Sequence, residues 1–371
     1  MSKGINAEGD ILSMTADGRD LNDLWLEFQN VVTIRNERRS MLVELMTFPV
    51  QNVIEDVPQI GTDDFEEASE FGVPKGVRPG LSYFSLAYDF KWYDMATRFS
   101  WKFLADASSA QVEAVNAAAI EADNRLVFKK VMNSIFRNTN RTADINATNY
   151  NVYALYNNDG TVPPEYKGVT HTSSHSHYLT SGNATIDSTD IEDQMEHLRH
   201  HGYSIANGTQ IVLMVNPAQA VEIRKFRANV ANNNSAVATY DFVPAQGGPG
   251  LIVPNAQGLL GTQVPNQLNG MPVIGSYGSV IIIEEDYIPA GYLLMFGTGG
   301  EGNLANPVGF REHANPSLRG LRLLGGNQVG YPLQDSYYQR GFGTGIRQRG
   351  GAVVTQITAS GSYTIPSAYA S

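Results

Sequence analysis

The feature that most constrains the fold is a long alternation of apolar and polar side chains between residues 86 and 103. Its apolar members are Leu86, Tyr88, Phe90, Trp92, Phe99, Trp101 and Phe103. Period-two alternation of this length predicts a long strand with two different faces. The 36 glycines and 17 prolines agree with this prediction, because they favour a turn-rich, strand-containing chain over a helical bundle.

An extended segment and an acidic loop precede this strand. Residues 48–60 are interrupted by Pro49 and Pro58, and the stretch that follows is rich in glycine and proline. Its acidic residues are Asp63, Asp64, Glu66, Glu67 and Glu70. We interpret residues 48–103 as one two-stranded arm with a charged tip. Because an isolated hairpin is only marginally stable in water, this arm must lie on a surface. That surface belongs to another subunit or, if the arm is an ordinary edge hairpin, to the same chain.

Two helices are predicted on either side of this arm. Apolar residues at helical spacing predict an amphipathic helix from Leu21 to about Arg39, which packs on its own subunit or on a neighbour. Ser108 and Gln111 have the spacing of a capping box, and an uninterrupted helical pattern continues to about Arg137. Roughly 30 residues at 1.5 Å each give a helix of about 45 Å, a length typical of a structural spine.

The rest of the chain alternates between predicted strands and helices. A capping box at Thr189 and Glu192 predicts a helix that ends at Gly202, and Asn216 followed by Pro217 predicts another. Strands are predicted at residues 210–215, 272–276, 280–284, 292–296, 318–324 and 352–358. Residues 187–300 are therefore expected to form a mixed α/β domain.

The charge of the chain is acidic and uneven. A net charge of −11 argues against a protein that grips nucleic acid through a basic face, although it permits one that encloses nucleic acid. Residues 1–80 hold 15 acidic and 7 basic residues, whereas residues 301–371 hold 3 and 6. Opposite signs at the two ends favour head-to-tail attraction between copies, and solvated faces are the alternative. No signal peptide and no apolar run of membrane-spanning length is visible, so we expect a soluble chain made in the cytosol, with no membrane contact.

No residue pattern predicts a catalytic centre, a cofactor site or a metal site. The lack of cysteine excludes disulfides, thiolate zinc sites and cysteine nucleophiles. The glycine-rich runs at residues 247–250 and 297–302 lack the Gly-Lys-Ser/Thr of a phosphate loop. Two groups of histidines remain, and their members are His171, His175 and His177, then His197, His200 and His201. The second group has helical spacing compatible with a metal but lacks the glutamate of the H-E-x-x-H pattern, so we expect both groups to be solvated.

The order of these elements resembles that of the major capsid proteins of tailed bacteriophages, which have the Hong Kong 97-type fold. Three segments carry the resemblance. They are the strand at 99–104 before the spine helix, the strand pair around Gly270-Met271-Pro272-Val273 and Ile288-Pro289-Ala290-Gly291, and residues 345–354, which are similar to the family's last strand of the peripheral domain. Architecture more than sequence unites this family, so each motif alone is weakly specific, but the resemblance covers nearly the whole chain.

The resemblance implies an α+β shell subunit with four parts. They are an N-terminal arm (1–47), an extended loop (48–100), a peripheral domain with the spine helix (101–145 and 303–371) and an axial domain (146–302). Such subunits assemble as hexamers and pentamers into an icosahedral virion shell around double-stranded DNA, without enzymatic activity or sequence-specific DNA binding. Separate scaffolding, portal and decoration proteins would be the further partners.

The implied contact between copies joins the acidic tip to an arginine-bearing surface. Its candidate residues are Asp63, Asp64, Glu66, Glu67, Glu70, Lys75, Arg311, Arg340, Arg347 and Arg349. Some relatives crosslink the loop covalently to a neighbouring subunit by a Lys–Asn isopeptide bond, for which Lys75 and Asn327 are the candidates. Two alternatives stay open: an encapsulin-type nanocompartment that has the same fold and encloses cargo enzymes, and a soluble α/β enzyme with an unusual hairpin.

Overall fold

The computed structural model describes residues 14–37, 41–58, 67, 72, 83–247, 259–325 and 333–370. The chain divides into two compact units, each assembled from three segments. The first unit is Met1–Ser40, Phe90–Lys130 and Arg311–Gly343, and the second is Met41–Asp89, Val131–Phe310 and Thr344–Ser371.

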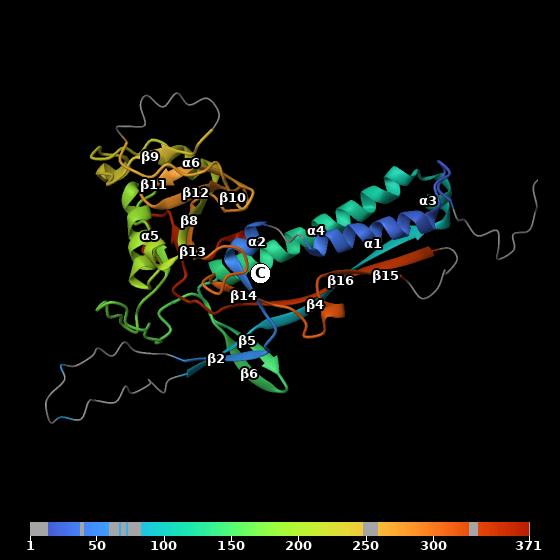
Figure 1. The fold of residues 1–371 in the computed structure, drawn as a ribbon, viewed down its shortest axis with the longest axis horizontal. Helices are drawn as coiled ribbons and strands as arrows, with labels where there is room; N and C mark the ends of the chain where they lie inside the picture. Colours follow the sequence, from blue (N-terminus) through green and yellow to red (C-terminus); the bar gives the residue numbers. More distant parts are fainter. Residues whose placement is uncertain are drawn as a thin grey trace, which may run out of the picture. The chain divides into compact units, whose positions relative to one another are not determined.

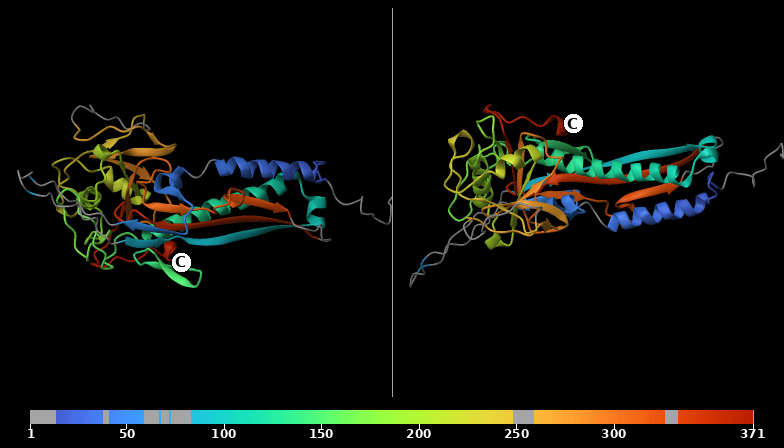
Figure 2. Two further views of the ribbon diagram at one scale, coloured as in Figure 1. Left: turned by 60° about the horizontal axis from the view of Figure 1, so that its bottom comes forward. Right: turned by 90° about the horizontal axis from the view of Figure 1, so that it is seen from above.

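The first unit packs two long helices along long strands (Figures 1 and 2). Its elements are α1 (Leu21–Glu37), β4 (Asp89–Ser100), α3 (Trp101–Asp106), α4 (Ser109–Phe136), a 3₁₀ turn (Pro316–Leu318), β15 (Leu321–Gly325) and β16 (Leu333–Ile346); β4, α4 and β16 also contribute residues to the second unit. β16 pairs with β4 and, in antiparallel register, with β15. The shared core consists of Val32, Ala119, Leu321 and Tyr338. Since Val32 lies in this core, α1 packs on its own chain, the first of the two interpretations above.

The predicted spine helix is confirmed as α4, which has 28 residues. The backbone N–H of Ser108 donates to the Gln111 side chain at 3.0 Å, which is one half of the expected capping box. Asp17 supplies a second cap, because its carboxylate accepts the Ser109 N–H at 3.1 Å and the Ser109 hydroxyl at 2.7 Å. These hydrogen bonds, with one from Thr15, lower the pKa of Asp17 to about 2. The segment before α1 thereby fixes the start of the spine helix.

The prediction of one strand from residue 86 to residue 103 is wrong at two points, because the chain forms two strands, β3 (Tyr83–Ala87) and β4, that are separated at Tyr88, and because β4 ends early. The strand β4 stops at Ser100, whose hydroxyl accepts the Phe103 N–H at 3.1 Å and caps the short helix α3. Trp101 and Phe103 are therefore helical, and the turn of the chain at Ser100 lets the Phe99 and Phe103 rings stack with their centroids 5.6 Å apart. The pairing of β4 with β16 also shows that this strand lies in a sheet of its own chain.

The second unit contains an eight-stranded sheet of order β10-β11-β12-β8-β13-β17-β7, with β9 paired to β11. Its strands are β7 (Tyr178–Thr180), β8 (Gln210–Val215), β9 (Phe242–Pro244), β10 (Gln267–Leu268), β11 (Met271–Tyr277), β12 (Val280–Glu284), β13 (Tyr292–Thr298) and β17 (Ala352–Gln356). The helices α5 (Ser188–His200) and α6 (Pro217–Ile223) bury their apolar sides against this sheet in one large core. The strands predicted in the interval 187–300 and the Asn216 cap of α6 are confirmed.

The remaining elements of the second unit are short. They are α2 (Met41–Met46), β1 (Thr47–Val50), β2 (Ile54–Pro58), β3 (Tyr83–Ala87), β5 (Arg141–Ile145), β6 (Thr148–Val152), β14 (Val308–Arg311) and 3₁₀ turns at Ile205–Asn207, Asn233–Ser235 and Ser367–Tyr369. No helix in the described ranges is both long and apolar enough to cross a bilayer.

Two local predictions need correction. The N-cap of α5 is Asp187, which forms a capping box with Asp190, two residues before the predicted box at Thr189. The Thr189 hydroxyl instead donates to Asp187, so a carboxylate takes the place that the sequence suggested for a hydroxyl. Residues 345–354 are not one strand, because β16 ends at Ile346 and β17 begins at Ala352.

Candidate subunit-contact surfaces

The base of the predicted arm is a two-stranded antiparallel ribbon. β2 pairs with β3 from Ile54 opposite Ala87 to Pro58 opposite Tyr83, and no third strand joins them within the described residues. The ribbon is attached to the rest of the unit at the last residue of β3, Ala87, which packs with residues of β5 and β6 in a small core. The outer part of the arm, 59–82, lies outside the described residues apart from two positions.

Glu55 ties the base of the arm to the end of β16. Its carboxylate accepts hydrogen bonds from Arg347 Nε at 2.8 Å and from the Tyr88 hydroxyl at 2.9 Å. Both members of the Glu55–Arg347 ion pair are about a quarter exposed, with side-chain exposures of 23% and 26%. Burial, with the Glu55 charge beside it, raises the pKa of Tyr88 far above its ordinary value. Arg347, an expected inter-subunit residue, therefore has a partner in its own chain.

Two glycines make room for the Tyr88 ring at this base. A Cβ on Gly309 would lie 2.3 Å from the ring, and one on Gly345 would lie 2.9 Å from it. Real side chains do not approach so closely, so both positions need glycine for this packing. Tyr88, one of the alternating aromatic residues of the sequence, therefore packs against glycines of β14 and β16.

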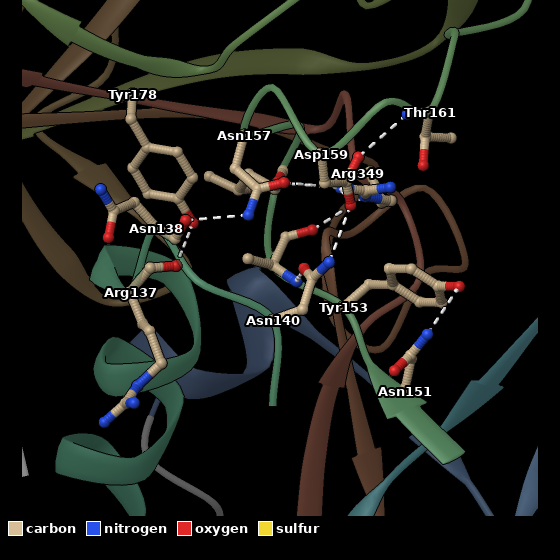
Figure 3. A network of polar contacts seen from close by, with 12 residues as sticks. Arg137, Asn138, Asn140, Asn151, Tyr153, Asn157, Asp159, Thr161, Tyr178 and Arg349 are labelled. Atoms are coloured by element: carbon tan, nitrogen blue, oxygen red, sulfur yellow. Dashed lines mark hydrogen bonds and ion pairs between the residues drawn. The ribbon is translucent and has the colours of Figure 1, made fainter. Parts of the chain in front are cut away.

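Arg340 and Arg349 are also occupied inside the chain. In the first unit, Arg340 pairs with Asp123 of α4 at 2.6 Å, with side-chain exposures of 8% and 4%. In the second unit, Arg349 is 2% exposed and binds Asp159 at 2.8 Å. Figure 3 shows Asp159 between Arg349 and Asn140. Although burial opposes ionisation, these contacts hold the pKa of Asp159 below its usual value.

The other expected contact residues divide by whether they are described. Arg311 is half-buried, and its guanidinium lies 4.9 Å from the centre of the Phe90 ring. Glu67 is exposed. Asp63, Asp64, Glu66, Glu70 and Lys75 lie outside the described residues, as does Asn327. The contact between an acidic tip and arginines stays a prediction.

The first unit carries exposed apolar surface that the expected site did not include. Trp92 and Met95 on β4 are 45% and 38% exposed. They line a groove of about 350 Å³, together with residues of α4, β15 and β16. On α1, the exposed apolar residues are Leu26, Val31 and Ile34. Exposed apolar residues that line a groove are typical of interaction sites. The signal in the sequence was the run of large apolar residues in this strand, of which Trp92 and Met95 stay exposed.

The prediction that both histidine groups are solvated is wrong. The loop at residues 171–177 lies against the end of α5, and rings of the two groups contact one another. His177 is fully buried, and His175 Nε2 lies 3.0 Å from the Nε2 of His201. Strand β7 and most of α5 separate the two groups along the chain, so spacing within either group gave no sign that they meet.

Comparison with known proteins places these features in context. No protein-family model and no curated protein matches the chain. A solved structure titled "Mycobacterium phage Patience" is 50% identical, with a TM-score of 0.77, over 100% of this chain and 97% of that one. The mature capsid of bacteriophage PhiM1 is 11% identical, with a TM-score of 0.51, over 86% of this chain and 88% of that one, and supports the fold alone. The SrpI encapsulin of Synechococcus elongatus PCC 7942 covers 91% of this chain and 98% of its own at 12% identity, but its TM-score of 0.48 carries no argument.

Proposed function

The chain belongs to the Hong Kong 97-type major capsid proteins of tailed bacteriophages, and from this premise we propose how its surfaces build the shell. It is a structural protein that assembles as hexamers and pentamers into the icosahedral shell of the virion. The observation that carries this conclusion is 50% identity along the full chain to a protein of a mycobacterial phage.

The proposal assigns four parts to the subunit. Residues 1–47 act as the N-terminal arm, 48–100 as the extended loop, 101–145 with 303–371 as the peripheral domain, and 146–302 as the axial domain. The ribbon of β2 and β3 supports this assignment, because it leaves its two outer backbone edges without strand partners in the described chain. Free strand edges are surfaces on which another chain can pair or pack.

The proposed contact between copies has an apolar and a charged part. The exposed apolar residues of β4 and α1 face a neighbouring copy, as the large obligate interfaces of assemblies require. The acidic tip reaches a surface that carries Arg311. Because three of the four candidate arginines already bind carboxylates of their own chain, the charged part sets orientation more than affinity.

The shell encloses double-stranded DNA without binding it by sequence, and it performs no catalysis. The net charge of −11 supports confinement over a basic binding face. The chain is made in the host cytoplasm and works with separate portal, scaffolding and decoration proteins. A Lys75–Asn327 crosslink would appear as a covalent ladder when particles are run on a denaturing gel, and monomer alone would dismiss it.

Two experiments test this function. Negative-stain microscopy of the expressed chain is expected to show closed shells or capsomers, and a monodisperse monomer would contradict the proposal. Particles purified from infected cells are expected to contain nuclease-protected DNA. Shells with a protein cargo in fixed ratio and no genome would instead identify a nanocompartment. Assembly measured between about 0.1 and 1 M salt separates the two parts of the contact, since only the charged part weakens within this range.

A further inference from the structure

Six of the seven histidines gather in the second unit, where a loop meets the end of α5. His171, His175 and His177 come from the loop, and His197, His200 and His201 come from α5 and its C-cap. One ring nitrogen from each of His171, His175 and His201 lies within 4.8 Å of the others. The distances from His175 Nε2 to His177 Nε2 and to His201 Nε2 are both 3.0 Å.

This spacing matches the first shell of a metal ion. Zinc binds imidazole nitrogen at about 2.0–2.1 Å, which places the ligand atoms of a tetrahedron about 3.3–3.4 Å apart. The separations of His175 Nε2 from His177 Nε2 and from His201 Nε2 are already close to that spacing. His171 needs a small movement of its ring, because the longest separation in the group of three is up to 4.8 Å.

The hydrogen bond of His177 to the backbone leaves its lone pair directed toward His175. His177 Nδ1 lies 2.6 Å from the carbonyl oxygen of Ala352, which can only accept, so Nδ1 carries the proton and Nε2 carries the lone pair. Backbone carbonyls orient metal-binding histidines in this way. His171 Nε2 is buried and has no hydrogen-bond partner. Leaving a buried nitrogen unpaired is unfavourable, and a bound ion would remove that cost.

Neighbouring residues fix the position of the His201 ring. The Tyr156 ring stacks on His201 at 5.5 Å and 20°. A Cβ on Gly350 would lie 2.6 Å from His201 Cγ, so glycine there is needed to seat the ring.

We propose that this cluster binds one divalent transition-metal ion per chain, with Zn²⁺ as the reference ion. Its ligands are His171, His175 and His201, and water takes the fourth position, as in zinc sites with three protein ligands. Ligands that are all imidazoles suit zinc, cobalt, nickel and copper, and they do not suit magnesium or calcium, which prefer oxygen. The bound ion joins the loop to the end of α5. In a chain without cysteine, it supplies the crosslink that a disulfide would otherwise give.

The test uses the purified full-length chain. After equilibration with a small excess of Zn²⁺ and gel filtration, elemental analysis is expected to find one zinc per chain in the wild type. His201→Gln is expected to lower the affinity at least tenfold. His313→Gln is the matched control, because His313 is the one histidine outside the cluster, and it is expected to behave as the wild type.

A second measurement needs no variant. Co²⁺ added to the wild-type chain is expected to give the strong visible absorption of a tetrahedral nitrogen site, and Zn²⁺ is expected to bleach it. Substoichiometric zinc together with a weak octahedral cobalt spectrum would overturn the proposal. Equal zinc retention by the His201→Gln variant would overturn it as well. Neither result bears on shell formation, which the particle experiments test separately.

Discussion

Substitutions in the ion pair between Arg340 and Asp123 test whether an arginine of this segment stabilises its own subunit or binds a neighbouring copy. The two side chains are 8% and 4% exposed and 2.6 Å apart, with Arg340 on β16 and Asp123 on the spine helix α4. Replacing Arg340 by Met leaves the carboxylate of Asp123 buried without this partner. Removing one partner of a buried pair costs about 3–5 kcal/mol, which is a large part of the roughly 5–15 kcal/mol that typically stabilises a protein.

The double variant Arg340→Met, Asp123→Leu is the matched control. Replacing both members of a buried pair by apolar residues is often neutral or stabilising. We therefore expect the free energy of unfolding of this variant to lie within about 1 kcal/mol of the wild-type value. Urea unfolding of the unassembled chain measures all four members of the cycle, and a coupling energy above about 2 kcal/mol is expected. For a chain of this size, the loss in the single variant lowers the melting temperature by roughly 4–6 °C, because the entropy of unfolding is about 2.1 cal/mol/K per residue.

The alternative interpretation of Arg340 makes the opposite prediction. If its main partner were on a neighbouring copy, the Arg340→Met chain would unfold at the wild-type midpoint and would fail only in assembly. That outcome would refute the assignment of Arg340 to the interior of the first unit. Unfolding and particle yield measured on the same preparations distinguish the two interpretations.

Three further changes probe other parts of the structure. Gly309→Ala is expected to destabilise the chain by about 1–3 kcal/mol, because its Cβ would lie 2.3 Å from the Tyr88 ring, whereas Gly361→Ala, in open space, is expected to leave the melting temperature unchanged. The pKa of Asp17 is lowered to about 2, so its stabilisation of α4 is complete above about pH 4 and is lost as the pH falls through 2. Between these pH values the melting temperature of Asp17→Asn is expected to change less with pH than that of the wild type. An equal dependence of melting temperature on pH in both chains would contradict the cap. Trp92→Ala is expected to reduce particle yield in microscopy more than it destabilises the unassembled chain, since the residue is 45% exposed and its other side packs on Phe90 and Arg322.

The sequence was informative where local signals decide the structure. The spine helix followed from an uninterrupted helical pattern and the Ser108–Gln111 spacing, both of which are readable within a few turns. The buried strand β8 and the Asn216 cap of α6 were equally local. The end of β4 was missed because a single hydroxyl, that of Ser100, turns a continuing alternation into a helix.

Contacts between distant segments were not readable from the sequence. β4 pairs with β16, which comes near the other end of the chain and is rich in glycine, a residue that weakens any strand signal. The histidine cluster joins two groups, each of which looked like ordinary polar surface when considered alone. Long-range pairing depends on which surfaces complement one another, and no window of sequence contains both partners.

The placement of the arginines changes the account of how copies of the chain attract one another. The segment 301–371 holds 6 arginines and 3 acidic residues, which suggested a basic surface for an acidic partner. The structure directs Arg340, Arg347 and Arg349 to carboxylates on α4, on β2 and after β6, where each fixes one element of its own subunit. Their charge is thereby neutralised within the chain. We therefore propose that affinity between copies comes mainly from apolar surface such as that around Trp92, because half of the arginines in this segment stabilise their own subunit.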